Sequence, residues 1–459
     1  MQNKSISDFG MRILCREKME SLNKNLIILY NILFFIVVVL GFPFIIPIIL
    51  LSEKRRQTVL KRLGLTSLPD EFIQSRMRHP GKKPIWVHAL SVGEVLSAAP
   101  LVKGLRNLFD TEDIIFSVST KTGFEIASEH LRDSVDAIFF FPYDIKFSVK
   151  HITGKLNPSL VVIVETDIWP NFLFEMKKRN IPVIFVNARL SKRSFVGYKR
   201  LGFFTKPLFF CFANICTQSM EDAKRFQALD VPSNRITVTG NIKFEQEFQP
   251  LPADEIEKLR QWMNIQQSQK VIVAGSTHKG EESILLEAFS KMKNDFDDLL
   301  LVVTPRDPKR ARSVFRIFES AGFSVSLMKE MGKISAGKRF DVIVVDILGI
   351  LKKLYAIADI AFIGGSLVDC GGHNPLEPAL FSKPIIFGQD MSDFDEISKM
   401  LVESGGAVRV HDANSIFEAV AMLIRDDNKA IKMGQRALQV FKANKGAVEK
   451  TLKVVEAYL

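Results

Sequence analysis

The sequence predicts an α/β protein with two doubly wound, Rossmann-like domains that face a ligand-binding cleft, preceded by a membrane-anchor helix. Three observations predict this architecture. Short apolar segments alternate with amphipathic helical segments in two successive runs, a break rich in acidic residues and proline separates the runs at residues 245–255, and residues 26–51 carry no charge. Strands that alternate with helices pair in parallel, and such sheets bind ligands beyond the carboxyl ends of their strands.

Length and composition narrow the classes of protein. The chain has 459 residues, of which 47% are hydrophobic and 25% charged, so it has enough apolar surface for two or three domains and is not disordered. The net charge of +11 favours an anionic partner, which is nucleic acid, an acidic membrane surface or a phosphorylated substrate. The four cysteines form no CxxC pair and indicate reduced thiols, and the seven histidines show no metal-binding spacing, so we expect no bound metal.

The uncharged segment at residues 26–51 is long enough to span a membrane, which takes about 20 apolar residues. Pro43 and Pro47 would bend its second half, so a single span and a bent helix within one leaflet are both open. No small-residue cleavage site follows, which argues against a cleaved signal peptide. A basic cluster comes next and favours the cytoplasmic side and anionic lipids; it contains Lys54, Arg55, Arg56, Lys61 and Arg62. The segment before the apolar run is basic too, which weakens this orientation signal.

The predicted boundaries follow from these patterns. Residues 1–52 form the leader and anchor, 53–83 a basic linker, 84–244 the first Rossmann-like domain, 256–435 the second, and 436–459 a C-terminal helix. The helical pattern itself starts at Asp427 and is expected to pack back across both domains. Seven strands are expected in each domain, starting with PIWVHA in the first and KVIVAGST in the second. Neither a GxGxxG fingerprint nor a Walker A loop is present.

Four charged residues of the first domain are candidates for chemistry. Glu94 opens a helix directly after a strand, where a carboxylate either complements the helix dipole or acts as a general base. Ser91 and His88 are expected to cap and pack. Glu165 and Asp167 follow an apolar strand, which makes them ligand-facing groups or parts of a capped turn before Pro170. Lys243, after a Gly-Asn turn, neutralises a phosphate or is a solvated linker residue.

The second domain offers loops suited to an anionic ligand. Gly275, Ser276 and Thr277 lie at a strand-to-helix turn that lets the backbone approach a ligand, and Arg306 follows the next strand as a bidentate partner for phosphate or carboxylate. A glycine-rich loop surrounds Ser366. The helix-start pattern that follows resembles a capping box and explains its own polar residues, but it does not explain the glycines; it consists of Asn374, Pro375, Leu376 and Glu377.

Taken together, these motifs resemble one family. HALSVGE, ETDIWPN, NARLSKRS, GNIKF, GSTHKGEE, PRDP and GGSLVDCGGHNPLEP occur in the order found in the 3-deoxy-D-manno-octulosonic acid (Kdo) transferases of Gram-negative bacteria. The resemblance implies a GT-B glycosyltransferase, inverting and metal-independent, without a cofactor. It implies CMP-Kdo as donor, a lipid A precursor as acceptor, and a place at the inner membrane with the catalytic domains on the cytoplasmic face, near anionic lipids.

The resemblance also assigns roles to residues. Glu94 would accept the proton of the acceptor hydroxyl, and Glu165 and Lys243 would stabilise the transition state. CMP-binding stretches would be Pro305–Arg306, Leu348–Ile350 and Asn374–Glu377. The sequence departs from the family in two places. Asp307 replaces the histidine of a Pro-Arg-His-Pro motif, and the triplet Leu348, Gly349 and Ile350 stands where Met-Gly-Glu is usual. Both departures concern the affinity for the donor.

Two other classes of protein fit parts of the pattern. Another two-domain nucleotide-sugar enzyme, such as a UDP-sugar 2-epimerase, would share the two domains but would need neither acceptor nor anchor. A membrane-tethered nucleic-acid-binding module would suit the charge, but no nucleic-acid-binding motif is present, so we expect no nucleic acid partner.

Overall fold

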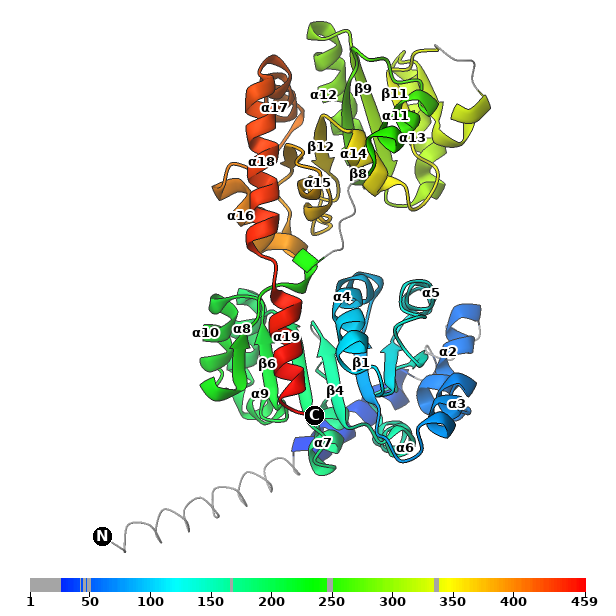
Figure 1. Cartoon of the computed structure of the whole chain (residues 1–459), viewed down its shortest axis with the longest axis vertical. Helices are drawn as coiled ribbons and strands as arrows, with labels where there is room; N and C mark the ends of the chain where they lie inside the picture. The colour runs from blue at the N-terminus through cyan, green and yellow to red at the C-terminus, as the bar shows by residue number, and fades with distance from the viewer. Residues whose placement is uncertain are drawn as a thin grey trace, which may run out of the picture. The chain divides into compact units, whose positions relative to one another are not determined.

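The structure, a computed structural model, describes residues 26–41, 43, 47, 51–165, 168–245, 251–333 and 338–459. The chain divides into two compact units (Figure 1). The first contains Met1–Gln246 together with Lys445–Leu459, and the second contains Glu247–Asn444. Each unit has its own parallel sheet, as the alternation of apolar and amphipathic segments predicts.

The described part of the first unit forms a seven-stranded parallel sheet in the order β3-β2-β1-β4-β5-β6-β7. The strand order reverses between β1 and β4, which is the switch point where doubly wound sheets bind ligands. All seven predicted strands of this domain are present. Their bounds are β1 Ile85–Ala89, β2 Ile114–Val118, β3 Ala137–Phe140, β4 Leu160–Val164, β5 Val183–Ala188, β6 Asn214–Thr217 and β7 Ile236–Val238.

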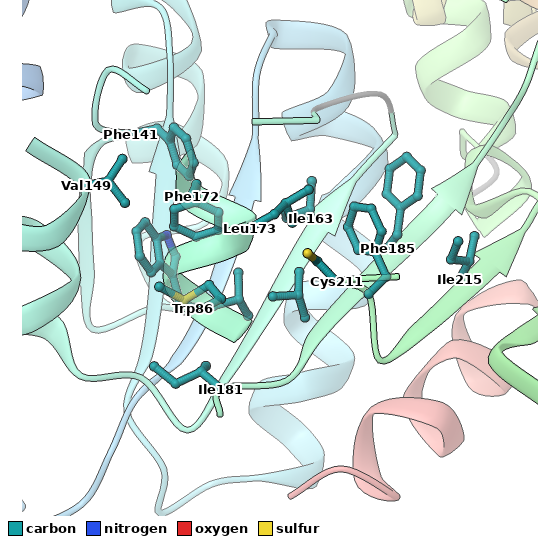
Figure 2. Packing of buried hydrophobic residues seen from close by; sticks show 14 of the residues in the cluster. Trp86, Phe141, Val149, Ile163, Phe172, Leu173, Ile181, Phe185, Cys211 and Ile215 are labelled. Carbon is teal, nitrogen blue, oxygen red and sulfur yellow. The ribbon is translucent and has the colours of Figure 1, made fainter. Parts of the chain in front are cut away.

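Helices cover both faces of this sheet, because the side chains on both faces of β1, β2, β4 and β5 are buried and mostly apolar. One face carries the cluster around Trp86 and Phe172 that Figure 2 shows, and the other carries Val87 and Leu101. The helices of the unit are α2 Glu53–Leu63, α3 Asp70–Arg78, α4 Val92–Leu108, α5 Lys121–His130, α6 Lys146–Leu156, α7 Pro170–Lys178, α8 Lys192–Arg200, α9 Gly202–Phe209, α10 Met220–Gln227 and α19 Ala447–Glu456, with short 3-10 turns at Ser233–Arg235 and Ile242–Glu245.

The stretch expected to be a basic linker, residues 53–83, is largely helical, so that prediction is corrected. Helix α2 ends at Gly64, whose left-handed backbone lets its N–H bond the carbonyl of Lys61. Arg62 donates hydrogen bonds to the carbonyls of Phe141 and Ser119, and Phe72 of α3 is buried in the core. The basic composition suggested a linker because these contacts are tertiary and cannot be seen in the composition.

The described part of the second unit also forms a seven-stranded parallel sheet, in the order β10-β11-β9-β8-β12-β13-β14, with its switch point between β8 and β12. The strands are β8 Lys270–Thr277, β9 Leu299–Pro305, β10 Val325–Leu327, β11 Val342–Val344, β12 Ile360–Ile363, β13 Ile385–Phe387 and β14 Ala407–Arg409. The helices are α11 Ala253–Trp262, α12 Glu281–Asp295, α13 Ala311–Ser320, α14 Leu351–Ile357, α15 Leu376–Leu380, α16 Asp395–Glu403, α17 Ala413–Arg425 and α18 Asp427–Ala443, with 3-10 turns at Pro308–Arg310, Met328–Lys333 and Ser392–Phe394.

The C-terminal helix predicted at 436–459 is two helices that belong to different units. Helix α18 belongs to the second unit and ends near Asn444, and α19 belongs to the first. Gly446, with a left-handed backbone, precedes α19, and the carboxylate of Glu245 accepts hydrogen bonds from the N–H groups of Gly446 and Ala447. Helix α19 then packs against α4 and completes the core of the first unit.

The predicted anchor is described only in part. Residues 26–41 are helical, whereas residues 1–25, 42, 44–46 and 48–50 lie outside the described residues. None of the helices in the described ranges combines the length and the apolar character that crossing a bilayer requires.

Two helical glycines allow a matched test of the packing. A Cβ at Gly434 in α18 would lie 1.9 Å from the carbonyl oxygen of Ser382, whereas a Cβ at Gly197 in α8 would meet nothing within 4 Å. We expect Gly434→Ala to lower the free energy of unfolding by about 1–3 kcal/mol through overpacking. Gly197→Ala should raise it by about 0.5–1 kcal/mol through helix propensity. Thermal unfolding of both variants measures this difference, and equal effects would contradict the close packing of α18.

Candidate functional site

The first candidate residue, Glu94, lies in the first turn of α4, directly after β1. Ser91 caps this helix and accepts a hydrogen bond from the N–H of Glu94, while Oε2 of Glu94 accepts one from the N–H of Leu90 at 2.6 Å. Ser91 is the cap, whereas the carboxylate of Glu94 binds the residue before the cap, and Glu94 is 7% exposed. The capping role expected of Ser91 is confirmed. His88 packs as expected, because it is buried, hydrogen-bonds Ser117 and stacks on Phe141.

Glu165 and Lys243 form an ion pair, although 78 positions separate them in the sequence. Glu165 directly follows β4, the neighbour of β1 at the switch point, and has a left-handed backbone with φ of 68°. Nζ of Lys243 lies 3.2 Å from its Oε1. The sheet therefore places the paired carboxylate and the loop of Glu94 after the two strands that flank the switch point. Asp167, the second acid of this motif, lies outside the described residues.

Asn187 supports this pair and was missed in the sequence. It closes β5 with a left-handed backbone, φ 56°, and is fully buried. Its Nδ2 donates to Oε1 of Glu165 at 3.2 Å, and its Oδ1 accepts the N–H of Ile242 at 3.1 Å. One amide therefore ties the carboxylate to the turn that carries Lys243. The signal in the sequence was an asparagine within an apolar strand, a residue type that tolerates this conformation.

In the second unit, the loops after β8 and β12 touch at the switch point. The backbone of Ser276 has φ of 57°, and a Cβ on Gly364 would lie 2.5 Å from its carbonyl oxygen. A Cβ on Gly275 would overlap the hydroxyl of Tyr355. The two glycines are therefore required by close contacts within the protein itself, and any ligand approach is additional.

A buried carboxylate shapes the glycine-rich loop. Glu281, at the start of α12, is fully buried and accepts hydrogen bonds from four backbone N–H groups. They belong to His278, Gly365, Ser366 and Leu367, at 2.7–3.0 Å. These hydrogen bonds give the buried carboxylate the partners that burial would otherwise deny it. Sequence reasoning did not single out Glu281, because a glutamate at a helix start is common on surfaces.

Two hydroxyls that the sequence offers as ligand contacts are committed to the fold. Ser366 Oγ donates to the carbonyl of Ile363 and accepts the N–H of Gly388 at 2.7 Å. Thr277 Oγ1 donates to Glu282 at 3.0 Å, and the Thr277 carbonyl accepts the N–H of Arg306. Both residues are fully buried. Their hydroxyl groups therefore hold the loops in place, and a ligand contact would have to come from the backbone.

Charged groups gather around the helix that begins near Asn374. Arg306, which is exposed, lies close enough to His373 and Glu377 to affect both of them electrostatically. Burial, helped by Arg306 and His278, lowers the pKa of His373 to about 4, and Nε2 of His373 is 2.8 Å from Nε2 of His278. Burial raises the pKa of Glu377 to about 7, against the lowering effects of Lys352 and Arg306. The cations Arg306 and Lys352 and the neutral His373 make this place suited to an anion.

The helix start after the glycine-rich loop agrees in outline with the sequence pattern. Oδ1 of Asn374 accepts the N–H of Leu376 at 3.1 Å, and Pro375 precedes the first residue of α15. Asn374 therefore holds the turn before α15, but Pro375 occupies the N-cap and no side chain caps this helix, so the helix cap expected of Asn374 is wrong.

The structure shows where the two departures from the family pattern lie. Asp307 accepts the N–H of Lys309 and so caps the turn after Pro305 and Arg306. Ile350 precedes the first residue of α14, and Leu348 before it is 81% exposed. The cap holds the side chain of Asp307 in the turn next to Arg306. The exposed side chain of Leu348 offers a ligand only apolar contact.

In the described part of the chain, the candidate residues neither form a metal cluster nor line a cavity that lies near α2 and α3 in the first unit. Within the described ranges, no three His, Cys, Asp or Glu side chains converge in a way that could hold a metal ion. A cavity of about 640 Å³ in the first unit lies between the α2–α3 segment and β3, and its walls include Lys61, Arg132 and Phe139. Glu94, Glu165 and Lys243 are not part of its lining.

Comparisons with known proteins agree with these motifs. Residues 58–246 match the family model of 3-deoxy-D-manno-octulosonic-acid transferase (kdotransferase). The 3-deoxy-D-manno-octulosonic acid transferase of Haemophilus influenzae is 32% identical over 410 residues, which cover 89% of this chain and 93% of the relative. The transferase of the same name from Chlamydia pneumoniae is 27% identical over 438 residues, 94% of this chain and 96% of the relative.

Among solved structures, UDP-GlcNAc 2-epimerase from Neisseria meningitidis, bound to UDP-GlcNAc, matches with a TM-score of 0.56. The sequence identity is 16%, and the match covers 81% of this chain and 100% of the epimerase chain. At this identity, the likeness shows the fold alone. Two parallel α/β units with this likeness define a protein of the GT-B fold class. The identity to the Haemophilus influenzae relative decides the family: the chain belongs to the Kdo transferases and is a glycosyltransferase.

The raised pKa of Glu377 gives a pH-dependent prediction. In the folded protein this carboxyl holds its proton up to pH 7, against 4.5 in the unfolded chain, so its contribution to stability is full below pH 4.5 and is lost as the pH rises through 7. Glu377→Gln should therefore raise the free energy of unfolding by about 1–3 kcal/mol at pH 8 and change it little at pH 5. Denaturant unfolding at both pH values measures this. Glu319→Gln, on the exposed side of α13, is the control, and an equal effect at both pH values would contradict the prediction.

Proposed function

We propose that this enzyme transfers Kdo from CMP-Kdo to a lipid A precursor, with inversion at the anomeric carbon and without a metal. The observation that carries the proposal is that candidate residues lie at the switch point of the sheet in both units. Glu94 and the Glu165–Lys243 pair follow the two strands that flank the switch point of the first unit, and Arg306 and the glycine-rich loop lie at the corresponding edge of the second. The full-length match to a Kdo transferase supports the sugar.

Glu94 is the proton acceptor in this proposal. The acceptor hydroxyl gives its proton to the carboxylate of Glu94, and its oxygen forms a bond to the anomeric carbon of Kdo. The bond from that carbon to the phosphate oxygen breaks, and CMP leaves with the bonding electrons. The N–H of Leu90 occupies one carboxylate oxygen, Oε2, and fixes the direction of the carboxyl group.

Glu165 and Lys243 stabilise the charges that develop during transfer. Lys243 is held by the carboxylate of Glu165, which the buried Asn187 fixes in turn, so the lysine has few rotamers to lose and its charge is preorganised. Negative charge accumulates on the leaving phosphate, and the anomeric carbon becomes positive. A cation and an anion side by side can each face the charge of opposite sign.

The second unit is proposed to hold the donor. Backbone groups of Gly275, Ser276 and Thr277 and the guanidinium of Arg306 would bind the phosphate and the sugar carboxylate. Pro305 and the stretches Leu348–Ile350 and Asn374–Glu377 would contact CMP. With Ile350 and Asp307 at the departing positions, fewer polar contacts are available, and we expect a weaker affinity for CMP than in relatives with the usual motifs.

The acceptor explains the apolar N-terminal segment. A lipid A precursor is an amphiphile of the inner membrane, and an enzyme tethered beside it meets it at a high local concentration. We place the protein at the cytoplasmic face of the inner membrane, where the basic residues after the apolar segment bind anionic lipids. Nucleic acid has no role in this proposal.

The proposal is tested by incubating the full chain with radiolabelled CMP-Kdo and a lipid A precursor in mixed micelles. We expect label in the lipid product, and mass spectrometry counts the Kdo residues added. Turnover of UDP-N-acetylglucosamine without transfer of Kdo would overturn the proposal and favour the epimerase alternative.

Glu94→Gln separates the role of the base from the hydrogen bond with Leu90. The amide oxygen can still accept the N–H of Leu90, but it cannot take up a proton, so we expect kcat to fall about 10²–10⁴-fold with an unchanged melting temperature. Glu94→Ala should lose the hydrogen bond from Leu90 as well, at a cost of about 0.5–1.5 kcal/mol in stability. Near-normal transfer by Glu94→Gln would remove Glu94 from the mechanism.

Lys243→Met tests the ion pair. If the charge acts in the transition state, kcat falls about 10²–10³-fold while KM for the acceptor changes less than about threefold. Lys224→Met, an exposed lysine of α10, serves as the control and should leave both constants unchanged. A large rise in acceptor KM with normal kcat would make Lys243 a substrate contact instead.

A further inference from the structure

The helix at residues 26–41 has two unlike faces. The less exposed positions recur every three or four residues, at 27, 30, 31, 34, 38 and 41, which is the spacing of one side of a helix. The other side exposes nine large apolar side chains. They are Ile28, Leu29, Ile32, Leu33, Phe35, Ile36, Val37, Val39 and Leu40. An exposed apolar surface of this extent marks a site of interaction.

The polar residues of this helix are used to dock it on the first unit. Tyr30 donates its hydroxyl hydrogen to Oδ2 of Asp144 at 3.0 Å. Asn31 and Asn171 exchange two hydrogen bonds through their amides, at 2.9 and 3.1 Å. Asp144 also accepts the N–H groups of Asn171 and Phe172, so the contact is built into the start of α7. In Figure 1 the helical segment of residues 26–41, at the blue end of the colour bar, lies beside α7.

The surface next to this contact suits a lipid headgroup. The ring of Tyr30 lies 6.4 Å from that of Phe204 in α9. The stretch Ser191–Phe209, which contains α8 and α9, has five lysines and arginines and no carboxylate. Leu201 and Phe203 in the same stretch are exposed. Lys206 of this stretch pairs with Asp230. Apolar side chains beside the other four cations match an anionic membrane surface. A second copy of the chain would instead bring two basic surfaces together.

We propose that residues 26–41 lie in the plane of the bilayer, with Tyr30 and Asn31 latched to the first unit and the apolar side inserted among acyl chains. This inference deepens the membrane association in the proposed function and decides between a span and an in-plane helix. A helix fastened by its side to a water-soluble domain cannot enter the hydrocarbon core end-on, because the domain would have to follow it. The latch therefore fixes how the first unit meets the membrane surface.

The experiment measures depth in the bilayer at three positions of the full chain. Leu29→Cys, Leu33→Cys and Leu40→Cys are labelled separately with an environment-sensitive fluorophore, with Cys15 and Cys370 replaced by serine. The protein is bound to vesicles of phosphatidylethanolamine and phosphatidylglycerol that carry a quencher at a shallow or a deep acyl carbon. An in-plane helix gives the three labels equal depths. A spanning helix separates the labels at 29 and 40 by about 16 Å at 1.5 Å per residue.

The latch is tested in the same assay with the double variant Tyr30→Phe and Asn31→Leu, which changes only the apolar helix. We expect the three labels to lose their common depth. Asn428→Leu, at an exposed position of α18, is the matched control and should keep it. Unequal depths in the parent protein, labels that no lipid quencher reaches, or a common depth that survives the double variant would overturn the inference. The assay contains neither donor nor acceptor, so a failure of Kdo transfer is seen separately.

Discussion

Parallel strand pairing is the constraint on which the rest of this structure depends. Parallel neighbours need a crossover, so most strands are followed by a loop and a helix, and the loops after the strands emerge at one edge of each sheet. Where the strand order reverses, adjacent loops diverge and leave room. The first unit puts Glu94 and Glu165 after the two strands at this point, and the second puts Thr277 and the loop at Ser366 there. Sites of such different sequence thus share one topological origin.

Buried polar groups then fix what the topology has brought together. Glu281 gathers four N–H groups from two loops, and Asn187 joins Glu165 to the turn before Lys243. A buried polar group left without partners costs about 1–3 kcal/mol, so each network penalises the displacement of its loop. Glu165, Asn187 and Ser276 also hold left-handed backbones that ordinary packing would not select. The loops are therefore set before any substrate arrives.

The sequence reveals the strands because fully buried parallel strands are short apolar runs, and all fourteen expected strands are present. It reveals Glu94, Glu165 and Lys243 as candidates because charged residues directly after such runs stand out. Their pairing depends on contacts across 78 positions, which no local pattern encodes. The helices at 53–63 and 70–78 were mistaken for a linker since their anchoring contacts, such as Arg62 to Phe141, are tertiary. Asn187 and Glu281 escaped notice because burial, rather than residue type, gives them their role.

Helix α19 ties the last residues of the chain to the first unit. Its residues Val448 and Leu452 close over Gly104 of α4, and the cap from Glu245 holds its start. During synthesis on the ribosome, the first unit emerges early but lacks this helix until the second unit has been made. The second unit has all its residues sooner and can complete its core while α4 still exposes an apolar side. Final assembly of the first unit therefore waits until the second unit has been made, and a stop codon before residue 445 would damage the domain that was made first.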